Sequence, residues 1–223
     1  MTEPETPTEP DAPTEPDAPQ KPFIVETTIG APQETVFRAL TDLSAIHEWF
    51  GWDYDGLEGE IRFIFVDHAR PTPPHTIVFE NDQVLTLIPD GPRTVVRIVM
   101  AGGLADASWD EVYDGMEEGW RSFFEQLRFL LERHPGTGRR TLYLSGTGTP
   151  SDVVAALDTG ERWHSSRWQR ISVDEFGHLI ALGWNDKDEL GVTVSTYGLD
   201  DAAFAALTDR WNARWSALVT PTP

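Results

Sequence analysis

The sequence contains no cysteine. This absence excludes disulfides, thiol catalysis and thiolate metal sites, and it argues against a secreted scaffold held together by disulfides. The 223 residues also contain no run of about 18 apolar side chains, and the N-terminus has neither a basic patch nor an apolar segment. We therefore expect a cytoplasmic protein without a membrane span or a secretory signal.

Basic residues are few: 17 Lys and Arg stand against 37 Asp and Glu, which gives a formal net charge of −20. Six acids and one lysine in the first 21 residues contribute −5, so the rest of the chain holds −15. Such a charge repels phosphate backbones, and no run of Lys and Arg interrupts it. We expect no nucleic-acid partner and no attraction to anionic membranes, and any charged partner should be basic.

Proline recurs at every third position from Pro4 to Pro22, separated by Thr, Glu, Asp and Ala. This spacing is typical of an extended polyproline II segment. The segment lacks the apolar residues that would offset the entropy cost of ordering it. Residues 1–22 are therefore predicted to be a disordered tail, either a plain spacer or a ligand for a proline-binding domain.

The region after the tail alternates strand-like and helix-like segments. Phe23 to Ile29 places alternate side chains on two faces, as a strand does. Gly30-Ala31-Pro32 then turns the chain into two short helical segments, which end near Leu40 and Gly51. Four further strand-like runs predict an antiparallel meander: Glu60–Val66, Thr76–Glu80, Val84–Ile88 and Thr94–Met100.

One long amphipathic helix is predicted from about Ser108, a good N-cap, to His134. Its apolar residues recur at steps of three and four: Trp109, Val112, Tyr113, Met116, Trp120, Phe123, Phe124, Leu127, Leu130 and Leu131. This stripe should pack on the predicted sheet. The acids near its start are interpreted as a solvated helix face, with a surface for a basic partner as the alternative: Asp106, Asp110, Glu111, Asp114, Glu117 and Glu118.

The remaining residues predict a second, smaller lobe. Strands are expected at Arg140–Ser145, Trp168–Val173, His178–Trp184 and Gly191–Tyr197, and helices at Asp152–Leu157 and Asp201–Leu218. Its turn Gly148-Thr149-Pro150 parallels Gly30-Ala31-Pro32, and both lobes end on a helix that contains tryptophan. An internal duplication whose second copy has lost strands and a chance similarity of two lobes both remain open.

A set of short motifs in the first lobe carries a family resemblance: Ile29-Gly30-Ala31-Pro32, Val36, Ala39-Leu40-Thr41-Asp42, Trp49-Phe50, Trp109, Gly115-Met116, Gly119-Trp120 and Leu127. The pattern resembles the START-like (SRPBCC) superfamily over about residues 23–134. Within it, the pattern is most similar to domains like the C-terminal part of the activator of heat-shock-protein ATPase. The resemblance implies an α+β helix-grip fold, in which an antiparallel sheet wraps a long C-terminal helix and a hydrophobic ligand often lies between them.

The sequence departs from that family in two places. It lacks room between Phe50 and Glu60 for the first strand hairpin, and it adds an unmatched lobe after His134. The second lobe could supply the missing strands, so that both halves form one composite structure. We accordingly expect a helix-grip domain of residues 23–135 followed by a smaller α+β lobe of residues 139–219, which could be a degenerate repeat.

Aromatic residues are abundant, with nine Trp and eleven Phe. Seven residues are predicted to line an apolar ligand cavity, with ordinary core packing as the alternative: Trp49, Phe50, Phe63, Phe79, Met116, Trp120 and Phe124. A wide pocket should also show small residues opposite these aromatics. The first hypothesis is thus a non-enzymatic START-like protein that binds a small hydrophobic molecule.

Two further hypotheses stay open beside ligand binding. One is a co-chaperone-like or regulatory module whose acidic surface meets a chaperone or another basic partner. The other is an enzyme of the cyclase or hydrolase kind, for which Arg62, Glu80 and Arg97 would be the polar residues. We predict no catalytic residues, no metal site and no cofactor, because the six histidines lack ligand spacing and no nucleotide-binding or Gly-x-Ser-x-Gly motif occurs.

Overall fold

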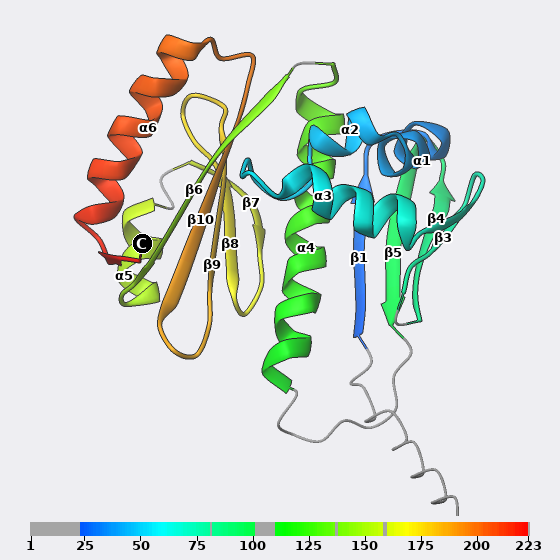
Figure 1. Ribbon diagram of the computed structural model, residues 1–223, viewed down its shortest axis with the longest axis horizontal. Helices are drawn as coiled ribbons and strands as arrows, with labels where there is room; N and C mark the ends of the chain where they lie inside the picture. Colours follow the sequence, from blue (N-terminus) through cyan, green and yellow to red (C-terminus); the bar gives the residue numbers. More distant parts are fainter. Residues whose placement is uncertain (1–22, 81, 101–109, 137, 158–159, 223) are drawn as a thin grey trace, which may run out of the picture.

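The computed structural model describes residues 23–222 except 81, 101–109, 137 and 158–159, and the side chains of 110–114 are also not described. The predicted disordered tail and the Ser108 N-cap lie outside these residues. The described chain forms two antiparallel sheets with helices between and beside them (Figure 1). An α+β fold is thereby confirmed.

The first sheet has the strand order β1-β5-β4-β3-β2. Its strands are β1 (Phe23–Ile29), β2 (Arg70–Thr72), β3 (Thr76–Val78), β4 (Gln83–Asp90) and β5 (Arg93–Met100). Every second residue of β1 is buried, as its alternating pattern predicts. Strand β2 forms within the proline-rich residues 70–74, which lie between two of the predicted strands. It lies at the sheet edge, where proline is tolerated.

Four short helical segments connect β1 to β2: α1 (Gln33–Thr41), α2 (Leu43–His47), α3 (Leu57–Arg62) and the π-helix η1 (Phe63–Asp67). The Asp42 carboxylate caps α2 by accepting from the Ser44 N–H at 2.9 Å. The strand predicted at Glu60–Val66 is wrong. The buried residues Leu57, Ile61 and Phe65 recur every four positions, which is a helical period and overrides the alternation of Ile61, Phe63 and Phe65.

The long helix α4 (Asp110–Arg133) stands between the two sheets and packs against both (Figure 1). One face joins the core of the first sheet through Phe124, Leu127 and Leu130. The other face places Phe129 in a separate buried cluster with Trp163 and Ile171 of the second sheet. The helix-grip expected from the sequence is confirmed, and the grip is two-sided.

The second sheet has the order β11-β6-β10-β9-β8-β7. Its strands are β6 (Arg139–Thr147), β7 (Glu161–Ser165), β8 (Gln169–Val173), β9 (Leu179–Trp184), β10 (Glu189–Tyr197) and β11 (Thr220–Pro221). Helices α5 (Pro150–Leu157) and α6 (Asp201–Ser216) cover its outer face. Leu207, Trp211 and Trp215 of α6 are buried there, and the helix predicted at Asp201–Leu218 is confirmed to within two residues.

The two lobes, residues 23–133 and 139–222, share one topology. In each, the first strand pairs with the last long strand, and the earlier strands follow in descending order: β1-β5-β4-β3-β2 and β6-β10-β9-β8-β7. The second lobe has therefore not lost strands relative to the first. The expectation that the second lobe supplies strands missing from the first is wrong as well, because the two sheets stay separate. The lobes meet at α4 and at the residues around Phe50.

Arg139 joins the lobes through a buried polar contact. Its guanidinium donates to the carbonyl oxygens of Phe50 at 2.9 Å and Gly51 at 2.7 Å, and to Gln126 Oε1 of α4. The backbone N–H of Arg139 donates to Glu48 Oε2 at 2.8 Å. The second lobe is thus held to both the helix and the loop of the first.

The acids of α4 are not a solvated face where their side chains are described. The second sheet approaches this face, and the Glu117 and Glu118 side chains are only 29% and 16% exposed. Arg121 pairs with both, through Glu117 Oε1 at 2.5 Å and Glu118 Oε1 at 3.4 Å. The solvated-face interpretation is wrong for these two acids. Asp106, Asp110, Glu111 and Asp114 lie outside the described side chains.

Candidate functional site

A cavity of about 460 Å³ lies in the first lobe, beneath the N-terminal half of α4. Five of the seven predicted ligand-binding residues line it: Phe50, Phe63, Phe79, Met116 and Trp120. The other two, Trp49 and Phe124, do not line it; both are fully buried in the core behind it. Residues that the sequence reasoning missed are Ile64, His68, Gln83, Gly115, Gly119 and Phe123.

The cavity wall consists of aromatic rings in edge and tilted contacts. Trp120 lies 5.4 Å from Phe79 and 6.1 Å from Phe123, measured between ring centroids, and Phe50 lies 4.4 Å from Phe123. The Trp120 Nε1–H donates to Gln83 Oε1 at 2.7 Å, so this polar atom is satisfied within the wall. The space is therefore apolar with few polar groups, which suits an apolar ligand.

The few polar groups of this cavity lie on its rim. His68 pairs with the Glu80 carboxylate, and its ring lies 4.1 Å from that of Phe63. Phe63, Ile64 and His68 belong to or follow the π-helix η1, in which the His68 N–H reaches Phe63 O five residues back. Of the polar residues considered for an enzyme, only Glu80 lines the cavity; Arg62 does not, and Arg97 pairs with Glu26 at 3.5 Å.

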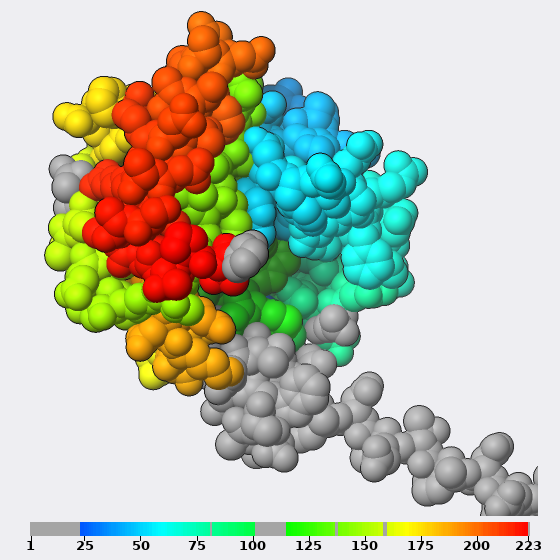
Figure 2. Space-filling view, turned by 60° about the vertical axis from the view of Figure 1, so that its left-hand side comes forward, coloured from blue at the N-terminus to red at the C-terminus, as the bar shows by residue number. Residues whose placement is uncertain are grey.

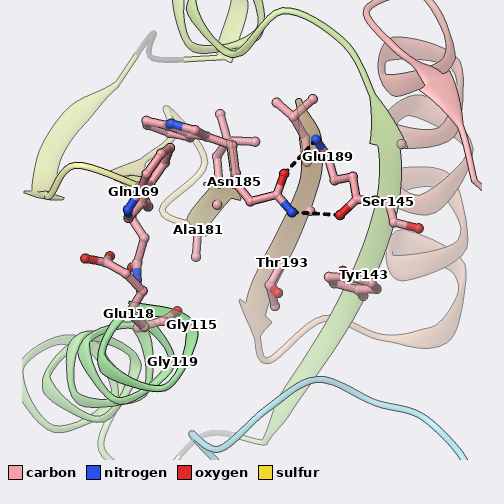
Figure 3. A pocket seen from close by; sticks show the side chains of 18 of the residues that line it. Gly115, Glu118, Gly119, Tyr143, Ser145, Gln169, Ala181, Asn185, Glu189 and Thr193 are labelled. Carbon is pink, nitrogen blue, oxygen red and sulfur yellow. Dashed lines mark hydrogen bonds between the residues drawn. The ribbon is translucent and has the colours of Figure 1, made fainter. Parts of the chain in front are cut away.

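A larger cavity of about 900 Å³ lies on the other side of α4, against the second sheet (Figure 3). In Figure 2 a hollow opens between the red C-terminal segment and the cyan helical region, with green atoms of α4 at its base. The floor is the row of strand residues Ser145, Gly191, Gly183 and Gln169, which are partners across β6, β10, β9 and β8. The sequence reasoning did not find this cavity.

Gly115 and Gly119 of α4 line both cavities, so the two spaces lie back to back on one helix. The glycines are four residues apart and hence on the same helix face. The sequence signal for the larger cavity is therefore this pair of helix glycines together with a second pair, Gly183 and Gly191, on neighbouring strands. It could not be used without the strand register, which sets Gly183 beside Gly191.

The larger cavity has a polar end near Gln169. The Gln169 amide nitrogen donates to the Glu118 carbonyl, while the Ser166 hydroxyl donates to Glu118 Oε2 at 2.6 Å. Gln169 is 5% exposed, and its Oε1 has no hydrogen-bond partner among the described residues. A buried acceptor without a partner is costly and is rare in folded proteins.

A third, smaller space of about 430 Å³ lies further along α4, next to β1 and β7, and contains a carboxyl–imidazole pair. Glu125 Oε1 lies 3.7 Å from His164 Nδ1 and accepts from the Thr27 hydroxyl at 3.2 Å. Burial raises the pKa of Glu125, although Arg128 opposes this. Burial also lowers the pKa of His164, and the charges of Arg121 and Arg128 lower it further.

Sheet order, the long helix and the short helices between β1 and β2 together define the architecture. The chain has a helix-grip fold, in which antiparallel sheets pack around one long helix. No family model and no curated protein matches the chain. In the described residues, no helix is both long and apolar enough to cross a membrane.

Several solved structures are similar to the chain. The AHSA1-like protein of Rhizobium etli is 24% identical, over 54% of this chain and 89% of its own, with a TM-score of 0.37. The Aha1 dimer from Colwellia psychrerythraea is 15% identical, over 52% and 100%, with a TM-score of 0.39. The di-domain ARO/CYC BexL from the BE-7585A biosynthetic pathway is 11% identical, over 87% and 93%, with a TM-score of 0.40.

Proposed function

We propose that the protein binds a small apolar molecule in the cavity of its first lobe. The observation that carries the proposal is that the aromatic side chains around Trp120 surround an unfilled space. At about 460 Å³, this space lies within the usual range for small-molecule sites. Among the described lining residues, the polar side chains are Gln83, which Trp120 satisfies, and the rim pair His68 and Glu80.

The second lobe supports this interpretation by contrast. The corresponding space between α6 and the second sheet is filled by Leu207, Trp211 and Trp215, which are all buried. The two lobes share a topology, so a helix-grip of this kind can close completely. The open space beneath α4 is therefore not a necessary result of the fold.

The proposal is tested by titrating the full chain with N-phenyl-1-naphthylamine, a neutral apolar dye, and following its fluorescence. The variant is Phe63→Ala, because Phe63 lies on the cavity rim and is already 54% exposed, so its removal should leave the fold intact. We expect saturable binding by the native chain and about a tenfold weaker affinity in the variant, since an aromatic contact to the ligand is lost.

The matched control is Phe176→Ala, which removes a phenylalanine that is 69% exposed on the second lobe and lines neither cavity. It should bind the dye as the native chain does. Absence of saturable binding by the native chain, or equal losses in the two variants, would contradict the proposal.

A further inference from the structure

We propose that the cavity between α4 and the second sheet is a separate binding site for a flat aromatic cation that carries an N–H donor. Tyr143 and Trp168 stand among its walls, and Glu118 and Gln169 lie at one end (Figure 3). This site goes beyond the proposed function, because its floor is the second sheet and, of its described lining, only Gly115 and Gly119 also border the first-lobe cavity.

The space exists because glycine stands on both of its walls. Gly115 and Gly119 face it from α4, and Gly183 and Gly191 from the sheet. A β-carbon added at Gly115 would meet no atom within 4 Å, and one at Gly119 would come no closer than 4.0 Å to Phe123. Close packing therefore does not require glycine at either helix position. Glycine inside a helix costs about 1 kcal/mol relative to alanine, so the open wall is kept at the expense of stability.

The sheet wall shows the same feature. A β-carbon at Gly183 would come no closer than 3.8 Å to the Trp168 carbonyl oxygen, which is an ordinary contact. Gly191 differs, because its missing side chain makes room for the Tyr143 hydroxyl, which a β-carbon would approach to 2.7 Å. Gly191 thus positions Tyr143, while Gly183 leaves the floor of the cavity empty.

The polar groups indicate a ligand that donates hydrogen bonds. The buried Gln169 Oε1 has no partner among the described residues, so a donor from a ligand would satisfy it. Among the described lining residues, the charged ones are the acids Glu118, Asp186 and Glu189 and the cation Arg167; Glu118 is also paired with Arg121 at 3.4 Å. The excess of acids, in a chain of net charge −20, favours a positive ligand over a negative one.

The aromatic groups indicate a flat ligand. The Arg167 guanidinium already lies over one face of the Trp168 ring, 4.4 Å from its centre, so the ring on which we expect a flat cation to stack is that of Tyr143. Tyr143 is held in place from behind by Trp52, whose ring stacks on it at 4.2 Å with an angle of 14° between the planes. A volume of about 900 Å³ accommodates a fused-ring molecule.

The test uses proflavine, a flat cation with amino groups, and thioflavin T, a flat cation without N–H groups, by fluorescence anisotropy at constant salt. Gly183→Leu places a side chain on the cavity floor, and we expect it to weaken both dyes about tenfold or more. Gln169→Leu removes the free acceptor, so it should weaken proflavine about tenfold and leave thioflavin T unchanged.

Two controls separate this site from other causes. Gly59→Leu adds the same side chain at a glycine of α3 that lines neither cavity and where an added β-carbon would meet nothing within 4 Å, so it should change neither affinity. Phe63→Ala alters only the cavity of the first lobe and should also leave both dyes unchanged. Equal affinities of the native chain and Gly183→Leu for proflavine would overturn the proposal, whatever the outcome in the first-lobe cavity.

Discussion

The two faces of α4 solve the same packing problem in different ways. Toward the first sheet, Phe124, Leu127 and Leu130 are buried in an apolar core. Toward the second sheet, the buried residues include the polar Glu125 and Gln126, whereas Gly115 and Gly119 border an open space on both sides. The apolar stripe of a helix thus predicts which face joins an apolar core. It does not predict whether the opposite, more polar face is exposed to water or covered by a second sheet.

The largest effect is expected from Phe124→Ala on the apolar face. Phe124 is fully buried and touches Trp120, with 5.6 Å between the ring centroids. Truncation should lower the free energy of unfolding by about 3–5 kcal/mol, because it removes buried apolar area and leaves a void. Urea denaturation measures this loss, and a change below about 1 kcal/mol would show that this face is loosely packed.

Arg139→Leu should have the next largest effect on stability, because it removes hydrogen bonds that join the second lobe to the first. It leaves the carbonyl oxygens of Phe50 and Gly51 without this donor, and Gln126 Oε1 keeps only the 3.5 Å bond from the Ser195 hydroxyl among the described residues. We expect a loss of about 2–4 kcal/mol in the same urea experiment. The control is Arg140→Leu, whose partner Asp201 is fully exposed, and it should change stability little. Similar losses in both variants would mean that Arg139 does not join the lobes.

Gly119→Ala tests whether the open space is kept at the expense of stability. Because the added methyl group meets no atom closer than 4.0 Å, it should raise the free energy of unfolding by up to about 1 kcal/mol. Thermal unfolding provides the measurement. A lower melting temperature would show that glycine is needed for packing, and it would remove the main support for a binding site on this face.

The smallest effect is expected from the pair Glu125 and His164, as a change in how the stability depends on pH. The pKa of His164 is lowered by burial below the ordinary value of about 6.5, so the unfolded chain binds the proton more readily. Its contribution to stability therefore falls as the pH drops through 6.5. His164→Gln should reduce the decline in stability between neutral and mildly acidic pH, measured by urea denaturation at each pH.

Glu125 has the opposite sign and provides the control. Its pKa is raised by burial, so the folded chain binds the proton more tightly and stability is lost as the pH rises through the folded pKa. Glu125→Gln should consequently steepen the acid-side decline that His164→Gln reduces. If both variants shift the profile in one direction, the pair does not titrate as its burial predicts.

Elements with a strong, single periodicity could be predicted from the sequence. The alternation of β1, the apolar stripe of α4 and the helix predicted at Asp201–Leu218 each match the structure within a few residues. The strand predicted at Glu60–Val66 is helical in the structure, because Ile61, Phe63 and Phe65 alternate while Leu57, Ile61 and Phe65 also keep helical spacing. Two periods coexist there, and tertiary packing decides between them.

The candidate sites differ in how far sequence reasoning reached. Aromatic residues are easy to recognise in a sequence, and five of the seven residues predicted from them line the first-lobe cavity. That these residues bind a ligand remains a proposal. Trp49 could not be told apart from them, because a filled core and a cavity wall have the same composition. The second cavity depends on side chains that are absent from neighbouring strands. Gly183 and Gly191 lie side by side because of the strand register, which the sequence does not reveal.

The shared position of α4 has a thermodynamic consequence. Gly115 and Gly119 form part of the wall of both cavities, so an occupant of either one acts on the same two turns of helix. If a ligand on one side changes the affinity of the other side by some factor, the reverse change must be equal. The effect of each cavity on the other is therefore described by a single coupling free energy, which can be measured from either side.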